Sequence, residues 1–227
     1  MGGSMSLGHV ANISIHVIFG ALAIALGFVI LFKTKGTPTH KRLGRYFVFL
    51  TSIVCATAIV GTLFFRYIPV FAVLSVLVPY QLLSGWYTVR KQSKEPSRLD
   101  AMLTLVAMVF LMVLAPKVLA SHAMVAFSSL GALATILLYD SARWIFPKRW
   151  HLVLWKYEHV YKMNASLFGM LSAFVGNVVR MGQPWSQLMP SAAGLLVILF
   201  FFLKLGRHNE EAPLARPSPE SSDAVST

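Results

Sequence analysis

The sequence predicts an all-α integral membrane protein with seven transmembrane helices. The chain has 227 residues, of which 56% are hydrophobic and only 12% are charged, and its mean hydropathy is +0.67. Soluble domains are about 45–50% apolar and about 25% charged, so an ordinary soluble protein is excluded. A spanning helix needs about 20 mostly apolar residues. Seven stretches without Asp, Glu, Lys or Arg approach or exceed this length: residues 1–32, 46–65, 67–89, 101–116, 118–139, 163–179 and 181–203.

Each stretch, taken in order, predicts one helix. The first three have 32, 20 and 23 residues and are long enough to span a bilayer. The fourth and sixth have only 16 and 17 residues. Lysine stems lie along apolar surface while the ammonium reaches the headgroups, so we expect the fourth to continue past Lys117 to Ala120 and the sixth to begin near His159. The fifth and seventh, with 22 and 23 residues, span directly.

The basic residues predict the orientation of these helices. If the helices alternate in direction, 17 of the 20 Lys and Arg residues fall on one side. The opposite side has only Arg66, Lys117 and Arg180. Because cytoplasmic loops carry the excess of Lys and Arg, the rich side faces the cytoplasm. We therefore expect the N-terminus outside and the C-terminus in the cytoplasm.

The end of the chain differs in composition from the rest. Residues 206–227 hold four of the eight acidic residues, three prolines and no apolar cluster. Such a segment cannot bury enough apolar surface to offset the entropy lost on ordering. We expect a transmembrane domain over residues 1–205 and a disordered cytoplasmic tail over residues 206–227.

The net charge of +12 does not indicate nucleic-acid binding. The basic residues are spread over three loops and the tail, as the orientation of a membrane protein requires, and they attract anionic lipid. We expect membrane lipid as a partner and no nucleic acid, and the sequence leaves open a protein partner or a homo-oligomer. Cys55 is the single cysteine, so no disulfide is expected.

Histidines are the candidates for a cofactor site. His16 and His122 lie toward the outer face, His122 about four residues into the fifth stretch, and His40 and His159 lie at the inner face. Haem iron binds neutral imidazole nitrogens, and glycines on the helix of His16 leave a smooth face beside it. This layout predicts b-type haem and transmembrane electron transfer, with His16 and His122 as an outer pair and His40 and His159 as an inner pair.

Two other functions stay open. A membrane zinc-dependent hydrolase needs at least three ligands at one depth. His40, His151 and His159 with Asp100 or Asp140 could supply them, although no HxxxH or HExxH spacing supports this. A small-molecule transporter or an accessory membrane subunit without cofactor needs only packed helices with a few polar groups. In that case the histidines form hydrogen bonds between helices.

Three acidic residues lie at the expected cytoplasmic ends of helices: Asp100, Asp140 and Glu158. Solvation or salt bridging is inexpensive there, so we interpret them as interface anchors rather than as a site. A retinal protein is excluded, because it needs a buried lysine in the last helix and Lys204 lies at the end of that helix.

Short segments carry a family resemblance: HVIFG at 16–20, HKRLGR at 40–45, LSGW at 83–86, HVYKM at 159–163 and SAF at 172–174. In these the chain resembles a bacterial family of small multi-pass membrane proteins, the group of domain of unknown function 2306. The resemblance implies a bacterial inner-membrane protein with a similar helix order, and no activity is established for that family. A looser likeness to two-haem membrane cytochromes rests on the histidine layout alone.

Overall fold

The protein is a bundle of long helices joined by short connections. The computed structural model describes residues 6–92, 95–179 and 182–214. In these residues the chain forms seven α-helices, one π-helical turn and one 3-10 turn. They are α1 (Leu7–Leu31), α2 (Pro38–Val60), η1 (Gly61–Phe65), α3 (Pro69–Lys91), α4 (Arg98–Ser121), α5 (Met124–Ala142), η2 (Arg143–Ile145), α6 (Lys148–Val178) and α7 (Trp185–Leu214).

Capping residues fix several helix boundaries. Thr37 accepts a hydrogen bond from the backbone N–H of His40 and so caps α2, whose first residue is Pro38. Proline suits this position because the missing N–H would have no partner within the helix. Ser97 and Asp100 form a capping box at the start of α4, where acidic charge also favours the positive end of the helix dipole.

The chain reverses between α4 and α5 at His122. This residue has a φ of 50°, in the left-handed region, and its side chain is exposed. α4 continues through Lys117 to Ser121, which agrees with the expectation that the fourth helix extends past Lys117 to Ala120. The expectation that His122 lies inside the fifth helix is therefore wrong, because it ends the fourth.

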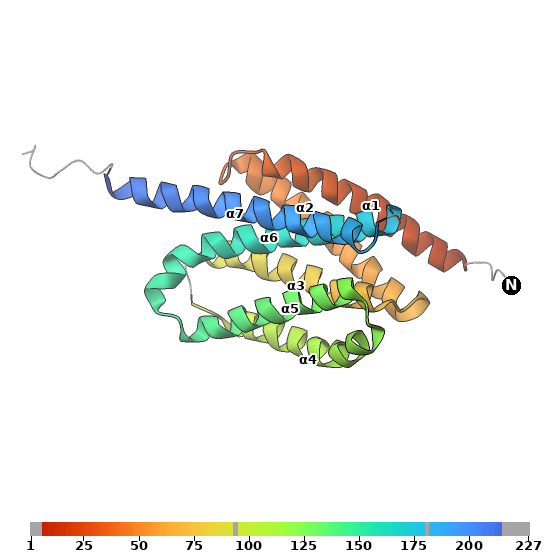
Figure 1. Cartoon of the computed structure of the whole chain (residues 1–227). Coiled ribbons are helices and arrows are strands. Elements are labelled where there is room, and N and C mark those ends of the chain that lie inside the picture. Colours follow the sequence, from red (N-terminus) through yellow and green to blue (C-terminus); the bar gives the residue numbers. More distant parts are fainter. Residues whose placement is uncertain (1–5, 93–94, 180–181, 215–227) are drawn as a thin grey trace, which may run out of the picture.

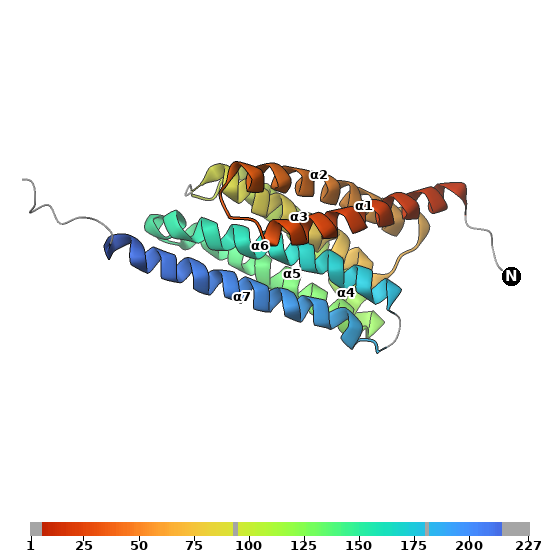
Figure 2. The same ribbon diagram turned by 90° about the horizontal axis from the view of Figure 1, so that it is seen from above.

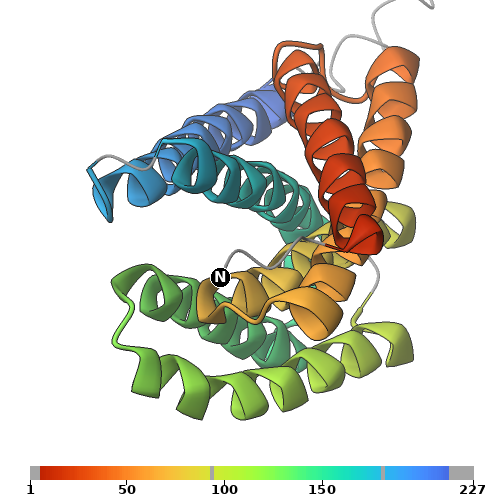
Figure 3. The ribbon, with the colours of Figure 1, turned by 90° about the vertical axis from the view of Figure 1, so that its right-hand side faces the viewer.

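The helices are arranged around α3. It packs against α2, α4, α5 and α6, while α1 pairs mainly with α2 and α7 pairs with α6. An end-on view shows three groups, with α1 and α2 on one side, α6 and α7 on another, and α4 and α5 below α3 (Figure 3). The long axes of all seven helices run in roughly the same direction (Figures 1 and 2).

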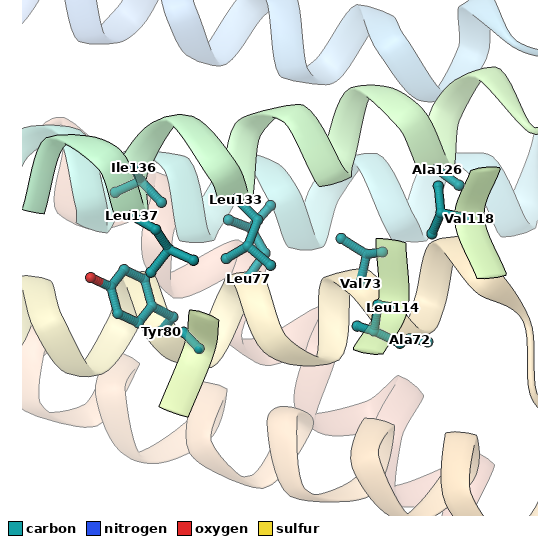
Figure 4. Close-up of a cluster of buried hydrophobic side chains, with 11 residues drawn as sticks. Ala72, Val73, Leu77, Tyr80, Leu114, Val118, Ala126, Leu133, Ile136 and Leu137 are labelled. Carbon is teal, nitrogen blue, oxygen red and sulfur yellow. The ribbon is translucent and has the colours of Figure 1, made fainter. Parts of the chain in front are cut away.

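Two apolar clusters hold these groups together. One lies among α3, α4 and α5 and includes Val73, Val118 and Leu133, all fully buried. Figure 4 shows this cluster with the hydroxyl end of Tyr80 at one extreme. The other joins α1, α2, α3 and α6 and includes Ala23 and Leu82. Many apolar side chains outside the clusters are exposed, as lipid-facing surfaces are.

Six helices are long and apolar enough to cross a membrane: α1, α2 with η1, α3, α4, α5 with η2, and α7 up to Arg207. The protein is therefore a multi-pass membrane protein by length and composition. α6 lies outside this group, and it begins at Lys148 rather than near His159 as expected. The reason is that the chain is already helical from Lys148: the side chains of Lys148 and Arg149 are exposed there, and those of His151 and Glu158 are buried. The expected domain boundary at residue 205 falls within α7, and residues 215–227 of the expected tail lie outside the described residues.

Candidate functional site

A buried ion pair lies where α3, α5 and α6 meet. Lys162, halfway along α6, has 0% of its surface exposed. Its Nζ donates hydrogen bonds to Asp140 Oδ1 at 2.8 Å, to Asp140 Oδ2 at 2.9 Å and to Ser84 Oγ at 2.6 Å. A lysine ammonium has three protons, so each has an acceptor from a neighbouring helix.

Hydroxyl groups extend this ion pair toward α4. Tyr80 donates its hydroxyl proton to Asp140 Oδ2 at 2.5 Å, and Thr104 Oγ1 lies 3.1 Å from the same phenol oxygen. Because the only phenol proton goes to Asp140, Thr104 donates to Tyr80. Tyr80 lies midway along α3, so the network reaches from the inner end of α5 toward the middle of the bundle.

A second ion pair adjoins the first on the side of η2. Arg143 Nε lies 2.9 Å from Glu158 Oε1, and Tyr139 donates to the same oxygen at 2.9 Å. Arg143 Nη1 also lies 3.7 Å from Asp140 Oδ1, which links the two pairs. The angle at Arg143 Nε is too poor for a hydrogen bond, and Glu158 Oε2 is buried without a partner. In this second pair, the Nε of Arg143 and the Oε2 of Glu158 are therefore each free to form a further hydrogen bond.

The local sequence explains how these charges converge. Asp140 and Arg143 are three residues apart at the end of α5, and Glu158 and Lys162 are four residues apart on α6. Side chains at these spacings share one helix face. Long side chains from the two faces meet beside α3, so two positive and two negative groups, each at most 5% exposed, lie together.

The interpretation of Asp140 and Glu158 as interface anchors is wrong. Both carboxylates are buried between helices, because each meets a cation there that neutralises it. The sequence did not single out Lys162, which was counted only among the basic residues expected on the cytoplasmic side. The signal that could have found the network is the occurrence of opposite charges at helical spacing in two consecutive helices.

The outer histidine pair is not brought together. His16 Nδ1 lies 3.0 Å from Thr57 Oγ1 of α2. Because Thr57 gives its own proton to a backbone carbonyl of its helix, His16 Nδ1–H is the donor. His122 lies at the exposed turn after α4, on the opposite side of α3 from α1 (Figure 3).

The inner histidine pair lies at neighbouring helices. His159 donates from Nδ1 to the Gly85 carbonyl at 3.1 Å, which leaves Nε2 as an acceptor. His40, in the first turn of α2, has a buried Nδ1 without a partner and is close enough to His159 for their charges to interact. One turn later, the Cβ position of Gly44 has no atom within 4 Å.

At two other glycines, Gly27 and Gly85, side chains of neighbouring helices fill the space that a Cβ would take. A Cβ on Gly27 would lie 2.5 Å from a methyl of Leu167 and 3.1 Å from the ring of Phe47. A Cβ on Gly85 would lie 2.8 Å from Lys162 Cβ. These glycines let α6 approach α1 and α3 closely, as small residues do between membrane helices.

The zinc alternative finds no ligand set in the described residues. Among them, no group of three or more His, Cys, Asp or Glu side chains is close enough to hold a metal ion. His151 packs against Phe146, with ring centroids 6.5 Å apart. Asp100 forms an ion pair with Lys91, at 2.5 Å.

Comparison with known proteins does not identify the chain: no protein family, curated protein or solved structure matches it.

Proposed function

We propose that the protein is a bacterial inner-membrane transport protein with seven spans, its N-terminus outside and its C-terminus in the cytoplasm. Its charged residues exclude α6 from the spans recognised by composition, yet Glu158, Lys162 and Asn164 are all buried. α6 packs between α3 and α7, so these charges face protein rather than lipid. A helix of 31 residues is long enough to cross in this environment.

The orientation has a direct test. A reporter that is active only in the periplasm should be silent when fused after Leu205 and active when inserted between α6 and α7. Equal activity at both positions would contradict the seven-span arrangement.

The observation that supports transport is the fully buried Lys162 bound to Asp140. A charge inside a membrane protein is costly, and such residues commonly mark ion or substrate pathways. A proton passing from Lys162 Nζ to Asp140 would neutralise both groups. A charged solute could instead replace one partner of the pair. Either event changes the contacts that hold α3, α5 and α6 together, which is the coupling that a transporter requires.

Proteoliposomes provide the test. Wild-type protein is reconstituted with an internal pH dye, and solute-induced currents and proton uptake are recorded for small organic anions, cations and zwitterions. We expect a response to at least one class, and we expect it to be lost in a double Asp140→Asn, Lys162→Met variant, which removes both charges together. Lys148→Met is the matched control, because the Lys148 side chain is 86% exposed. No wild-type response, or an unchanged response in the double variant, would contradict the proposal.

The inner histidines support a second candidate, b-type haem and electron transfer. His40 and His159 could offer imidazole nitrogens from neighbouring helices, and the space beside Gly44 is open. Bound haem would supply one-electron redox chemistry there. Protein purified after haem supplementation should show a Soret band that shifts on reduction with dithionite and disappears in His40→Ala. Colourless protein would contradict this candidate.

The relation to the family of domain of unknown function 2306 stays a prediction, as does the bacterial inner membrane as the location. An accessory subunit without transport activity is the remaining alternative. It would bind a partner and give no solute response.

A further inference from the structure

The connection between α1 and α2 carries Lys35 across to α7. Lys35 Nζ donates to the carbonyls of Ile30 at 2.8 Å and Leu31 at 3.0 Å, and it lies 4.8 Å from the ring centroid of Phe201. Lys204 follows Phe201 by three residues and so shares its face of α7. Two of the three ammonium protons of Lys35 are used, which leaves one for a ligand.

Two histidines converge on the same place from α2 and α6. The Cβ position of Gly27 on α1 touches Phe47 of α2 and Leu167 of α6, so these two helix faces meet near the inner end of α1. His40 precedes Phe47 by seven residues and His159 precedes Leu167 by eight. Both spacings are about two helical turns, which keeps each histidine on the converging face. Figures 1 and 2 both show the α1–α2 connection beside α6 and α7.

These four basic groups lack an acidic partner among the described side chains. The four described carboxylates, Glu95, Asp100, Asp140 and Glu158, are paired with other basic residues. Burial and the neighbouring Lys204 lower the pKa of Lys35. His40 Nδ1 is buried without a partner.

Two other basic residues on this side have an acidic or aromatic partner. Lys91 pairs with Asp100 at 2.5 Å, and the Arg90 guanidinium lies 4.0 Å from the Trp86 ring centroid. A general excess of cytoplasmic charge does not require basic groups from the α1–α2 connection, α2, α6 and α7 to gather without an acidic partner among the described side chains.

We propose that Lys35, His40, His159 and Lys204 bind an anionic phosphate group at the inner ends of α1, α2, α6 and α7. Ammonium and imidazole N–H groups are good donors to phosphate oxygens, and His159, whose Nδ1 proton goes to Gly85, donates through Nε2 when the phosphate charge favours a second proton on its ring. Clusters of basic groups between membrane helices suit lipid headgroups. The apolar side chains around the site favour a phospholipid as the source. Phe32 is 87% exposed, and Phe200 and Leu203 are exposed on α7. The site is independent of the proposed transport function.

Native mass spectrometry of the purified full chain tests the proposal. Phosphatidylglycerol and phosphatidylcholine with identical acyl chains are titrated onto the protein in mild detergent, and inorganic phosphate is titrated separately by calorimetry. Wild-type protein should prefer phosphatidylglycerol. Loss of two charge-assisted contacts in Lys35→Gln, Lys204→Gln should weaken binding about tenfold or more. Lys33→Gln, Arg207→Gln is the matched control, since it removes two exposed basic residues of the same side.

The results distinguish the two phosphate sources. Tight phosphatidylglycerol binding without phosphate binding identifies a lipid site, and phosphate binding with the same mutational dependence identifies a site for free phosphate. His40→Gln, His159→Gln should also weaken binding while the elution profile of the folded protein is unchanged. Equal weakening in the control variant, no effect of the histidine variant, or no binding of either probe by the wild type would overturn the proposal.

Discussion

The two sides of α6 differ in the kind of polar group that is buried there. Toward α3 and α5, the buried polar groups include the charged side chains of Asp140, Glu158 and Lys162. Toward α1 and α2, the helices meet through small and apolar side chains, and the polar contacts farther out are neutral. His16 donates to Thr57 Oγ1, and Asn12 donates to the Thr57 carbonyl.

The difference follows from how many helices surround each region. The charged network is enclosed by α3, α4, α5 and α6, which together supply counter-charges and hydroxyl groups. α1 buries only Ala23 and Gly27 and exposes most of its surface. A charge on α1 would find few partners and would face lipid, whereas a neutral hydrogen bond needs only one partner on α2. Charge is thus confined to the part of the bundle that can neutralise it.

Breaking the charged side should have the largest effect. Lys162→Met leaves Asp140 buried beside a single weakly placed cation, and loss of one partner of a buried pair costs about 3–5 kcal/mol. Unfolding of the purified protein in detergent measures this loss. Asp140→Asn, Lys162→Met should restore much of the stability, because no uncompensated charge remains. If the single variant is as stable as the double variant, the ion pair does not contribute as its geometry indicates.

Close helix packing gives a prediction of intermediate size. Gly85→Ala places a methyl 2.8 Å from Lys162 Cβ, which cannot rotate away, so we expect a loss of about 1–3 kcal/mol. Gly27→Ala should cost less, because the nearest atoms are methyls of Leu167, which can rotate. Gly44→Ala is the control, with no atom within 4 Å and a gain in helix propensity. Thermal unfolding should rank the three variants in this order, and a different order would contradict the packing at α6.

The neutral side should show the smallest effect. His16→Ala removes one hydrogen bond between α1 and α2, and such contacts between membrane helices contribute about 0.6 kcal/mol and at most about 1.7 kcal/mol. His122→Ala should change the free energy of unfolding very little, because the side chain is exposed. Chemical unfolding of both variants checks this. If His16→Ala lowers the free energy of unfolding as much as Lys162→Met does, the two sides of α6 do not differ in the way described.

Much of the helix order could be predicted from uncharged length alone. α1, α2, α3 and α7 each overlap most of one expected stretch, because their charges lie toward their ends. The rule misplaced the start of α6, because Lys148 and Arg149 lie in an exposed first turn while Glu158 and Lys162 are buried in the protein. A count of charges cannot tell a lysine that reaches the headgroups from Lys162, which meets Asp140 across the bundle.

The candidate site could not be predicted for a related reason. Lys162 bonds to Ser84 and Asp140, which are 78 and 22 residues away in the chain. Such contacts depend on how α3, α5 and α6 rotate about their axes, and every face of these helices contains apolar residues. The histidines were easier to notice, yet the structure brings only His40 and His159 near each other.

The ion pair between α5 and α6 also constrains how the chain enters the membrane during synthesis. An Asp, Lys or Arg at the centre of an inserting helix costs about 2.5–3.5 kcal/mol in the translocon, so Lys162, halfway along α6, carries this penalty if α6 inserts alone. Asp140 and Arg143 leave the ribosome before Glu158 and Lys162, with η2 and a short turn between them. We expect α5 to wait at the translocon until α6 emerges, so that Asp140 and Lys162 enter the lipid together as a neutral pair.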